Sequence, residues 1–398
     1  MRCKVKRGSD GIWYARPYLG RTPDGKSVRK YKQFPNAKSE EEAQALADAW
    51  AANLTVSGDM KNAVLFSLLE TYTQRRLLLG ASPNSGRTYR LFNKYVARYI
   101  GNANARDLTP LDFIYFEGRL LLSKEEGGQG LSQNTVRNVH DYLRAAYKFF
   151  VKAGICDTNP LIDVDKPALV KHEAKALNIG DYVKLDAQIK PMLKPEVLDK
   201  RSYRRALNAF AAWFSLVTGA RVGEVCAVRR CDIDRESRKA IISGNVIEEP
   251  HKKPYRRPIT KGRLARRVPI IEEQIRTIDT FIALQDAYCG NLASDAPLVT
   301  VDGTYIRPTT VSRAFSTIAK RIDIPKGFCF HDLRHTNATW QLTNGVEVQT
   351  VSKRLGHADE AITMRTYGHV MPGREEYAAA VIDDVMSAAT ITRKEVCQ

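Results

Sequence analysis

Six side chains in the second half of the chain have the types needed to cut a phosphodiester bond. Such a bond resists attack because its oxygens repel a nucleophile and because the departing alkoxide is a poor leaving group, so a catalyst must neutralise charge and deliver a proton. Guanidiniums, an ammonium, imidazoles and a phenol can together supply charge, acid, base and nucleophile. The residues are Arg221, Lys261, His331, Arg334, His357 and Tyr367.

Two arginines are expected to clamp the scissile phosphate. A guanidinium keeps its charge and binds two phosphate oxygens in a fork, which lysine cannot imitate. Arg221 is followed three residues later by Glu224 in a helix-like stretch, so the carboxylate lies on the same face and can orient the guanidinium from behind. A single arginine near a glycine is more often a surface residue, and the assignment of Arg221 therefore depends on its motif.

The phrase His331-Asp-Leu-Arg-His-Thr336 supplies the second arginine, Arg334, and a histidine three residues before it. This spacing on a predicted helix start points both side chains the same way, and the helix N-terminus adds partial positive charge. A lone histidine is more often structural than catalytic, but the whole phrase is far more specific. His335 is expected to face away as support.

Taken together, these segments resemble the tyrosine recombinases, the family of phage and mobile-element integrases, over nearly the whole chain. The resemblance implies that Tyr367 is the nucleophile, that Lys261 is a general acid for the departing 5′ oxygen, and that His357 donates a hydrogen bond to a non-bridging oxygen. It also implies a 3′-phosphotyrosyl intermediate, formed without metal, ATP or cofactor. The segments that carry it are Thr218-Gly-Ala-Arg-Val-Gly-Glu224, Thr260-Lys-Gly262, His331 to Thr336, Leu355-Gly-His357 and Thr366-Tyr-Gly-His369.

The assignment of Lys261 competes with its basic neighbours. Thr260-Lys261 in or beside a predicted hairpin turn matches the family pattern, although Gly262 and Ala265 stand where threonine and serine are more usual. Any of the neighbouring basic residues could instead be a plain contact to the DNA backbone. They are Lys252, Lys253, Arg256, Arg257, Arg263, Arg266 and Arg267.

Composition favours a polyanionic partner. The formal charge is +18 and the pI about 9.6 over 398 residues, and no apolar run is long enough to cross a membrane. The seven cysteines are scattered and form no C-x-x-C pair, which is typical of reduced thiols in the cytoplasm and predicts no metal site. We expect a cytoplasmic, nucleoid-associated protein of a bacterial host.

The chain is expected to be multidomain α+β. Residues 1–58 read as a small basic sheet followed by a helix capped by Ser39, and the resemblance makes them an arm-type DNA-binding domain. A solvated edge hairpin that uses lysine against aggregation is the alternative. The expected DNA contacts here are Trp13, Arg16, Arg29 and Lys30.

Residues 62–165 are predicted to be all helical, and the resemblance makes them a core-binding domain. One helix starts at Ser132 and presents basic residues on the face opposite its apolar side. Ordinary solvated charge is the alternative reading of that face. The expected DNA contacts are Thr135, Arg137, Arg144 and Lys148.

Residues 161–175 read as a linker, and residues 176–398 as a mainly α catalytic domain with a small antiparallel sheet over 240–247 and 256–270, ending in a C-terminal tail. The tail repeats apolar residues at helical spacing after Tyr377, so a surface must cover them, in the same chain or on a neighbouring protomer.

The resemblance implies a homotetramer on double-stranded DNA with core and accessory arm sites, and a directionality factor or host DNA-bending protein as a further partner.

Three other functions compete with a site-specific recombinase that integrates or excises a mobile element or phage. A type IB topoisomerase uses similar chemistry, but an N-terminal arm domain argues against it. A metal-dependent transposase needs three carboxylates and a divalent ion. A DNA-binding regulator with a dead catalytic domain would not need competent residues at every site position.

Overall fold

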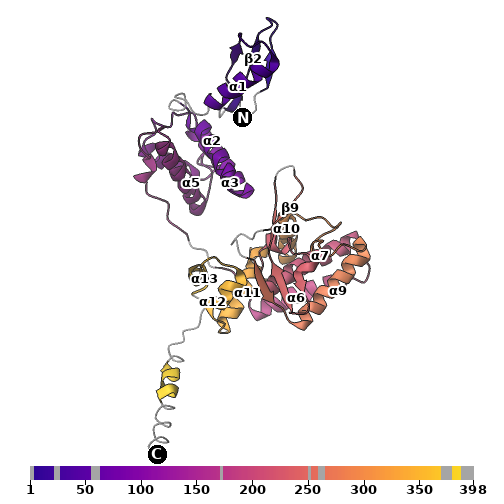
Figure 1. The fold of residues 1–398 in the computed structure, drawn as a ribbon. Helices are drawn as coiled ribbons and strands as arrows, with labels where there is room; N and C mark the ends of the chain where they lie inside the picture. Colours follow the sequence, from indigo (N-terminus) through magenta and orange to yellow (C-terminus); the bar gives the residue numbers. More distant parts are fainter. Residues whose placement is uncertain are drawn as a thin grey trace, which may run out of the picture. The chain divides into compact units, whose positions relative to one another are not determined.

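The computed structural model describes residues 4–21, 27–54, 63–170, 174–249, 252–258, 265–368 and 379–386. The chain divides into two compact units, residues 1–171 and 172–398 (Figure 1). The multidomain α+β layout expected from the sequence is confirmed, with small antiparallel sheets at the start of the first unit and within the second.

The first unit begins with short strands and one helix. Three antiparallel strands form a sheet in the order β1-β2-β5, and two further strands pair as β3-β4. The small sheet expected within residues 1–58 is present. β1 has no clear strand signal in the sequence, because only Val5 of its three residues is apolar and buried. The sequence Thr22-Pro-Asp-Gly25 is typical of a turn between two strands, and it lies outside the described residues. The elements are β1 (Val5–Arg7), β2 (Trp13–Ala15), β3 (Tyr18–Arg21), β4 (Ser27–Arg29), β5 (Lys32–Phe34) and α1 (Glu40–Leu54).

The predicted cap of α1 is confirmed. The amide of Glu42 donates to Ser39 Oγ at 3.2 Å, and the Glu42 carboxylate accepts from the amide of Lys38 at 2.9 Å. These bonds satisfy amides that a helix start leaves without partners. The buried face of α1 is narrow, because Ala43 and Ala47 pack against the sheet while Leu46 is 43 % exposed.

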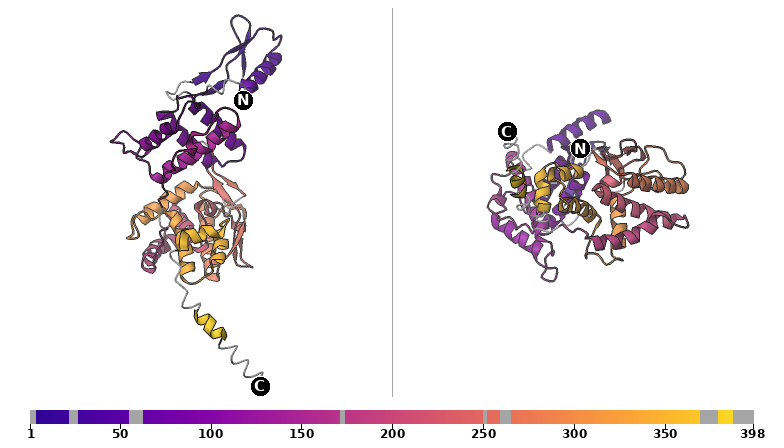
Figure 2. Two further views of the ribbon diagram at one scale, coloured as in Figure 1. Left: turned by 90° about the vertical axis from the view of Figure 1, so that its left-hand side faces the viewer. Right: turned by 90° about the horizontal axis from the view of Figure 1, so that it is seen from below.

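A helical bundle completes the first unit (Figure 2). Ser82, Thr109 and Ser132 cap three of its helices, each accepting a hydrogen bond from the amide three residues on. The core consists mainly of aromatic and branched side chains, among them Phe113 and Tyr147. The helices are α2 (Leu65–Leu78), α3 (Pro83–Tyr99), α4 (Pro110–Leu121), α5 (Gln133–Lys152) and the short 3₁₀ turn η2 (Pro160–Ile162).

The second unit is mainly helical, with α7 buried at its centre. Phe210 of α7 stacks on Phe281 of α9 with ring centroids 3.9 Å apart, and Figure 1 shows α6, α7 and α9 side by side. Its helices and short turns are α6 (Ile179–Leu193), α7 (Lys200–Thr218), α8 (Val222–Val225), η3 (Arg230–Asp232), α9 (Glu272–Cys289), α10 (Pro308–Ala319), α11 (Phe330–Thr343), α12 (Val348–Leu355) and α13 (Glu360–Tyr367).

The strands of this unit form two small sheets instead of the single sheet expected over 240–247 and 256–270. The expected strands form, but β9 pairs with β8, whereas β10 lies in a separate sheet of order β10-β7-β6. The predicted hairpin of 256–270 is therefore wrong for the described residues, because its two strands belong to different sheets. The strands are β6 (Ile233–Asp234), β7 (Lys239–Ile242), β8 (Asn245–Ile247), β9 (Tyr255–Arg257) and β10 (Arg266–Pro269).

Of the tail, only residues 379–386 are described, and they are helical. Val381, Ile382 and Val385 are 39 %, 60 % and 63 % exposed. Tyr377 lies outside the described residues.

Candidate active site

Arg221 stands at the junction of α7 and α8. Gly219 ends α7 with a left-handed φ of 67°, and a Cβ there would lie 2.7 Å from Leu355 Cδ2 and 2.8 Å from Asn337 Oδ1. Glycine is therefore required both by the turn and by the close approach of α11 and α12. The turn delivers Arg221 to the N-cap of α8, where its side chain remains partly exposed.

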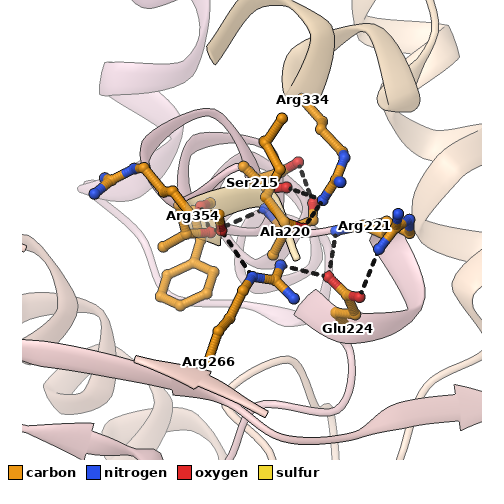
Figure 3. A network of polar contacts seen from close by, with 11 residues as sticks. Ser215, Ala220, Arg221, Glu224, Arg266, Arg334 and Arg354 are labelled. Atoms are coloured by element: carbon orange, nitrogen blue, oxygen red, sulfur yellow. Dashed lines mark hydrogen bonds and ion pairs between the residues drawn. The ribbon is translucent and has the colours of Figure 1, made fainter. Parts of the chain in front are cut away.

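Glu224 supports Arg221 as the sequence predicted. Its carboxylate accepts from Arg221 Nη1 at 3.1 Å and from the Arg221 amide at 3.0 Å (Figure 3). The same carboxylate accepts from Arg266 Nη2 at 2.7 Å. Burial alone would raise the pKa of Glu224, but the charges of Arg266 and Arg221 outweigh it and hold the pKa below its ordinary value. Glu224 is therefore ionised at neutral pH.

Arg266 is an internal residue of the site. It was expected among the residues that could simply contact the DNA backbone, but it is only 9 % exposed and its Nη2 is paired with Glu224. Its Nε donates to the carbonyl of Arg354 at 2.8 Å, at the end of α12 (Figure 3). Arg266 thus ties β10 to both α8 and α12.

Arg334 of α11 is almost completely buried, at 2 % exposure. Its Nη1 donates to the carbonyls of Gly219 at 2.7 Å and Leu355 at 2.8 Å, so it joins the end of α7 to the end of α12. Its Nη2 is buried and, among the described residues, has no hydrogen-bond partner. Burial and the charge of Arg221 lower the pKa of Arg334 to about 9, which still leaves it charged at neutral pH. A charged donor held in place with spare capacity suits an anionic ligand.

The two histidines of α11 lie edge to face. The ring centroids of His331 and His335 are 4.8 Å apart at an interplanar angle of 86°. Crowding by protein, the neighbouring His335 and the charges of Arg334 and Arg221 lower the pKa of His331 to about 4. His331 is therefore neutral at pH 7, although its side chain remains exposed to solvent.

Tyr367, the predicted nucleophile, contacts His335. Its hydroxyl lies 2.6 Å from His335 Nδ1, so the expectation that His335 faces away is wrong. Tyr367 is only 2 % exposed and packs with Leu342, Val351 and other apolar residues of α11 and α12. Burial raises the pKa of Tyr367 to about 12, although the charges of Arg334 and Arg221 act in the opposite direction. The phenol is therefore protonated at neutral pH and needs a base before it can attack.

His357 begins the connection from α12 to α13. Gly356 before it is left-handed, with φ 69°, and ends α12. His357 Nδ1 lies 2.7 Å from Thr363 Oγ1. Burial and the charges of Arg334, Arg221 and Arg266 lower the pKa of His357 to about 4, so the ring is neutral. When the Thr363 hydroxyl donates to Nδ1, the hydrogen is on Nε2, which can donate to a phosphate oxygen.

Lys261 lies outside the described residues, since 259–264 are not among them. The strand that follows this segment is β10, which carries Arg266. Lys261 as general acid remains a prediction from the sequence.

The structure brings five predicted residues to one end of the second unit. Arg221 comes from the start of α8, Arg334 and His331 from α11, His357 from the end of α12, and Tyr367 from the last residue of α13. The charges of Arg221 and Arg334 shift the pKa values of His331, His357 and Tyr367, so the five residues lie within electrostatic reach of one another. The arrangement can hold an anion between guanidiniums beside a phenol and neutral imidazoles.

The site also contains three residues that were not predicted from the sequence, His335, Arg266 and Arg354. His335 was detectable, because it follows His331 by one helical turn and thus lies on the same face. Arg354 donates from Nη2 to the carbonyl of Val217 at 3.0 Å, and it holds the end of α7. No sequence signal separates Arg266 and Arg354 from the many basic residues around them.

The expected DNA contacts at the start of the chain fall into two groups. Arg16 is exposed, and its guanidinium lies over the ring of Tyr31 at 5.1 Å from the centroid. Arg29 and Lys30 are also exposed. Trp13 is half-buried against the sheet core with Arg7 over its ring, which is a packing role.

The expected contacts on α5 also divide. Arg144 and Lys148 are exposed, as a DNA contact requires. Thr135 instead shares a hydrogen bond with Ser132 at the start of the helix, at 2.9 Å between hydroxyls. Arg137 donates from Nη1 to the carbonyl of Pro167 at 2.6 Å, so α5 holds part of the segment predicted as a linker.

In the part of the chain that the structure describes, no helix is long and apolar enough to cross a bilayer. Over the same residues, no cluster of three histidine, cysteine or acidic side chains is arranged to hold a metal ion.

Comparison with known proteins gives consistent matches. Residues 196–374 match the phage integrase family. A XerC-like tyrosine recombinase of Caldanaerobacter subterraneus is 23 % identical over 390 residues, covering 92 % of this chain and 94 % of the relative. The ICEBs1 integrase of Bacillus subtilis is 23 % identical over 300 residues, covering 74 % of this chain and 76 % of the relative.

Solved structures share the fold. The Tn1549 transposon integrase in complex with transposon right end DNA matches with a TM-score of 0.64 at 18 % identity, covering 81 % of this chain and 99 % of that one. A lambda integrase tetramer bound to a Holliday junction matches with a TM-score of 0.54 at 16 % identity, covering 90 % and 96 %.

Proposed function

We propose that the chain cuts and rejoins DNA through a 3′-phosphotyrosyl bond at Tyr367. Residues 196–374 match the phage integrase family, and the chain is a tyrosine-type site-specific DNA recombinase. The observation that supports this assignment best is the convergence of Arg221, Arg334, His357 and Tyr367 on one end of the second unit.

The arginines neutralise the scissile phosphate. Arg334 is held rigidly by two carbonyls and keeps Nη2 for the ligand, while Glu224 fixes Arg221 from behind. Fixed charges cost no reorganisation when negative charge builds up on the phosphorane, so they stabilise the transition state more than water does. His357 donates to a non-bridging oxygen, and His331 lies beside the same phosphate.

Strand cleavage then exchanges the phosphate bond to the 5′ oxygen for a bond to the tyrosine oxygen. The Tyr367 hydroxyl gives its proton to a neighbouring base as its oxygen attacks phosphorus, the bond to the 5′ oxygen breaks, and Lys261 protonates that oxygen. The ester is kept in the phosphotyrosyl bond, so a 5′ hydroxyl from another strand can reverse the step without ATP or metal. Cutting and rejoining are one activity run in two directions.

The protein partner is proposed to be the chain itself, as a homotetramer on two DNA sites. Residues 62–165 are proposed to bind the core site through the exposed Arg144 and Lys148, and residues 1–58 to bind accessory arm sites through Arg16, Arg29 and Lys30. A directionality factor or host DNA-bending protein is a further proposed partner. The chain is proposed to act in the bacterial cytoplasm on nucleoid DNA.

A nicked duplex in EDTA tests this function. The crossover site is taken from the DNA junctions flanking the gene, and the nick is placed so that the cut fragment diffuses away and rejoining is blocked. We expect a covalent protein–DNA adduct that survives denaturant and disappears with protease. A metal-dependent transposase would not cut in EDTA, and a catalytically dead regulator would never cut. Recombination between two sites, and not only relaxation of supercoils, distinguishes the recombinase from a type IB topoisomerase.

A further inference from the structure

The hydroxyl of Tyr367 is hydrogen-bonded to a residue outside the expected catalytic set. His335 Nδ1 on α11 lies 2.6 Å from the Tyr367 oxygen on α13, and the ring centroids are 5.6 Å apart. His331 instead packs edge-on against His335 at 4.8 Å. The histidine in direct contact with the reacting oxygen is therefore the second one of the motif.

The protonation states favour proton transfer along this bond. Burial lowers the pKa of His335, so its ring is neutral at pH 7 and one nitrogen carries a lone pair. Burial raises the pKa of the Tyr367 phenol to about 12, which keeps it protonated at neutral pH. When the phenol donates to Nδ1, the ring hydrogen is on Nε2. Donor and acceptor are then already aligned within the distance that general base catalysis requires.

Charged groups around His335 shift its pKa in opposite directions. Arg334 on the same helix lowers the pKa, whereas Asp332 raises it. His331 on the same helix and His357 from the α12–α13 connection are neutral at pH 7, and Tyr367 faces the ring from α13. Once the proton has moved to His335, the negative charge of Asp332 offsets the positive charge of the imidazolium.

We propose that His335 is the general base that takes the hydroxyl proton of Tyr367 as its oxygen attacks phosphorus. The proton moves to His335 Nδ1, the oxygen–phosphorus bond forms, and the bond to the 5′ oxygen breaks as the general acid protonates it. In rejoining, the phenolate leaves and recovers the proton from Nδ1. The inference rests on the proposed function and gives a catalytic role to His335, which lay outside the six residues singled out from the sequence.

A purely structural role for the same contact makes different predictions. His335 could serve only to hold Tyr367 in its buried position, where the apolar residues of α11 and α12 already surround it. Such a latch would slow attack, so its removal would leave the cleavage rate unchanged or raise it. Removal of a general base would slow cleavage, and the size of that loss would depend on the pKa of the nucleophile.

The experiment combines His335→Asn with a change in the nucleophile. The asparagine side-chain oxygen can accept the hydrogen bond near the position of Nδ1 but cannot take the proton, and His331→Asn is the matched control one helical turn earlier. Adduct formation is measured in single turnover on the nicked duplex at pH 7, at saturating protein. Each variant is made with tyrosine or with a ring-fluorinated tyrosine at position 367, whose phenol loses its proton more readily. DNA affinity and thermal unfolding are measured to confirm that each variant is folded.

We expect His335→Asn to slow adduct formation on the order of 10²-fold, the usual scale for a general base. Fluorinated tyrosine at position 367 should largely restore the rate of this variant. Its rate should then lie within about threefold of that of the protein that keeps His335 and carries the same fluorinated tyrosine, because a more acidic phenol depends less on a general base. Arg334→Ala and His331→Asn should gain no comparable rescue.

Two results would overturn the inference. One is a His335→Asn variant that cuts as fast as the unsubstituted protein or faster, which would make the contact a latch. The other is a loss that fluorination leaves unchanged, which would make it structural. If the unsubstituted protein forms no adduct at all, the proposed function fails instead, and the two failures are distinguished by that control.

Discussion

Arg266 and Glu224 form a buried ion pair, with 2.7 Å between Nη2 and Oε2 and side-chain exposures of 7 % and 0 %. The pair connects β10 to the start of α8, and the second oxygen of the same carboxylate holds Arg221. Arg266 Nε also binds the carbonyl of Arg354, close to His357. One internal arginine therefore fixes two parts of the catalytic site that are far apart in the sequence.

The first prediction concerns this pair. Arg266→Met should destabilise the catalytic unit by about 3 kcal/mol, because removing one partner leaves the other charge buried without full compensation. Glu224→Gln should also destabilise it. The double variant should lose less than the sum, since no unpaired charge remains from that contact. Urea unfolding of the catalytic unit measures all three, and strictly additive losses would show that the two residues do not interact.

Lys261 gives a test that concerns the leaving group and not binding. A 5′ alkoxide departs slowly unless it is protonated, whereas a 5′ thiolate, with a pKa near the 8.5 of cysteine, departs unaided. We expect Lys261→Ala to slow cleavage of ordinary DNA by about 10²-fold or more. With sulfur at the bridging 5′ position, the variant should cut nearly as fast as the unsubstituted protein.

Arg221→Ala and Arg334→Ala are the controls for this substrate, and they should stay slow because their charge stabilisation is still missing. If sulfur does not rescue Lys261→Ala, this lysine is a phosphate contact. The acid would then be sought among Lys252, Lys253 and the histidines.

Much of the fold could be predicted from the sequence because its signals are local. The helix caps at Ser39 and Ser132 form as expected from the sequence. Strand pairing could not be predicted in the same way. β9 and β10 are consecutive in the chain, but each pairs with a partner that precedes both, and such choices depend on packing of the whole unit.

The site was predictable where motif and chemistry agreed. The link from Glu224 to Arg221 follows from helical spacing and is confirmed. The prediction that His335 faces away from the site was wrong because it considered only the neighbouring Arg334. His335 follows His331 by one helical turn, so the two histidines lie on the same face of α11. The burial of Arg266 had no sequence signal, because it stands among basic residues that look alike.

Residues 1–58 are predicted to bind accessory sites. Deleting them should abolish binding to arm-site DNA and leave weak binding to the crossover site. Loss of exposed Arg16, Arg29 and Lys30 removes phosphate contacts, so the affinity should fall less steeply with salt. Salt titration of binding measures the slope, and an unchanged slope would argue against an arm-binding role.

The tail is predicted to pack on a neighbouring protomer, with packing in the same chain as the alternative. Val381, Ile382 and Val385 are exposed on the helical part of the tail, and an apolar face of this kind requires a covering surface. Ending the chain after residue 375 should prevent tetramer assembly on DNA while single-site binding persists. Ile382→Asp, which keeps the full length, should have the same effect. Intact tetramers of both variants by mass measurement would contradict the exchange.

Mapping the covalent bond tests the central claim most directly. The adduct formed on the nicked duplex is digested with protease and nuclease, and the peptide that carries the nucleotide remnant is sequenced by mass spectrometry. We predict a remnant attached through a 3′ phosphate to the Tyr367 oxygen, and no adduct from Tyr367→Phe, which lacks only the attacking oxygen and should still bind DNA. A remnant on another residue, a 5′ linkage, or an adduct formed by Tyr367→Phe would contradict the account.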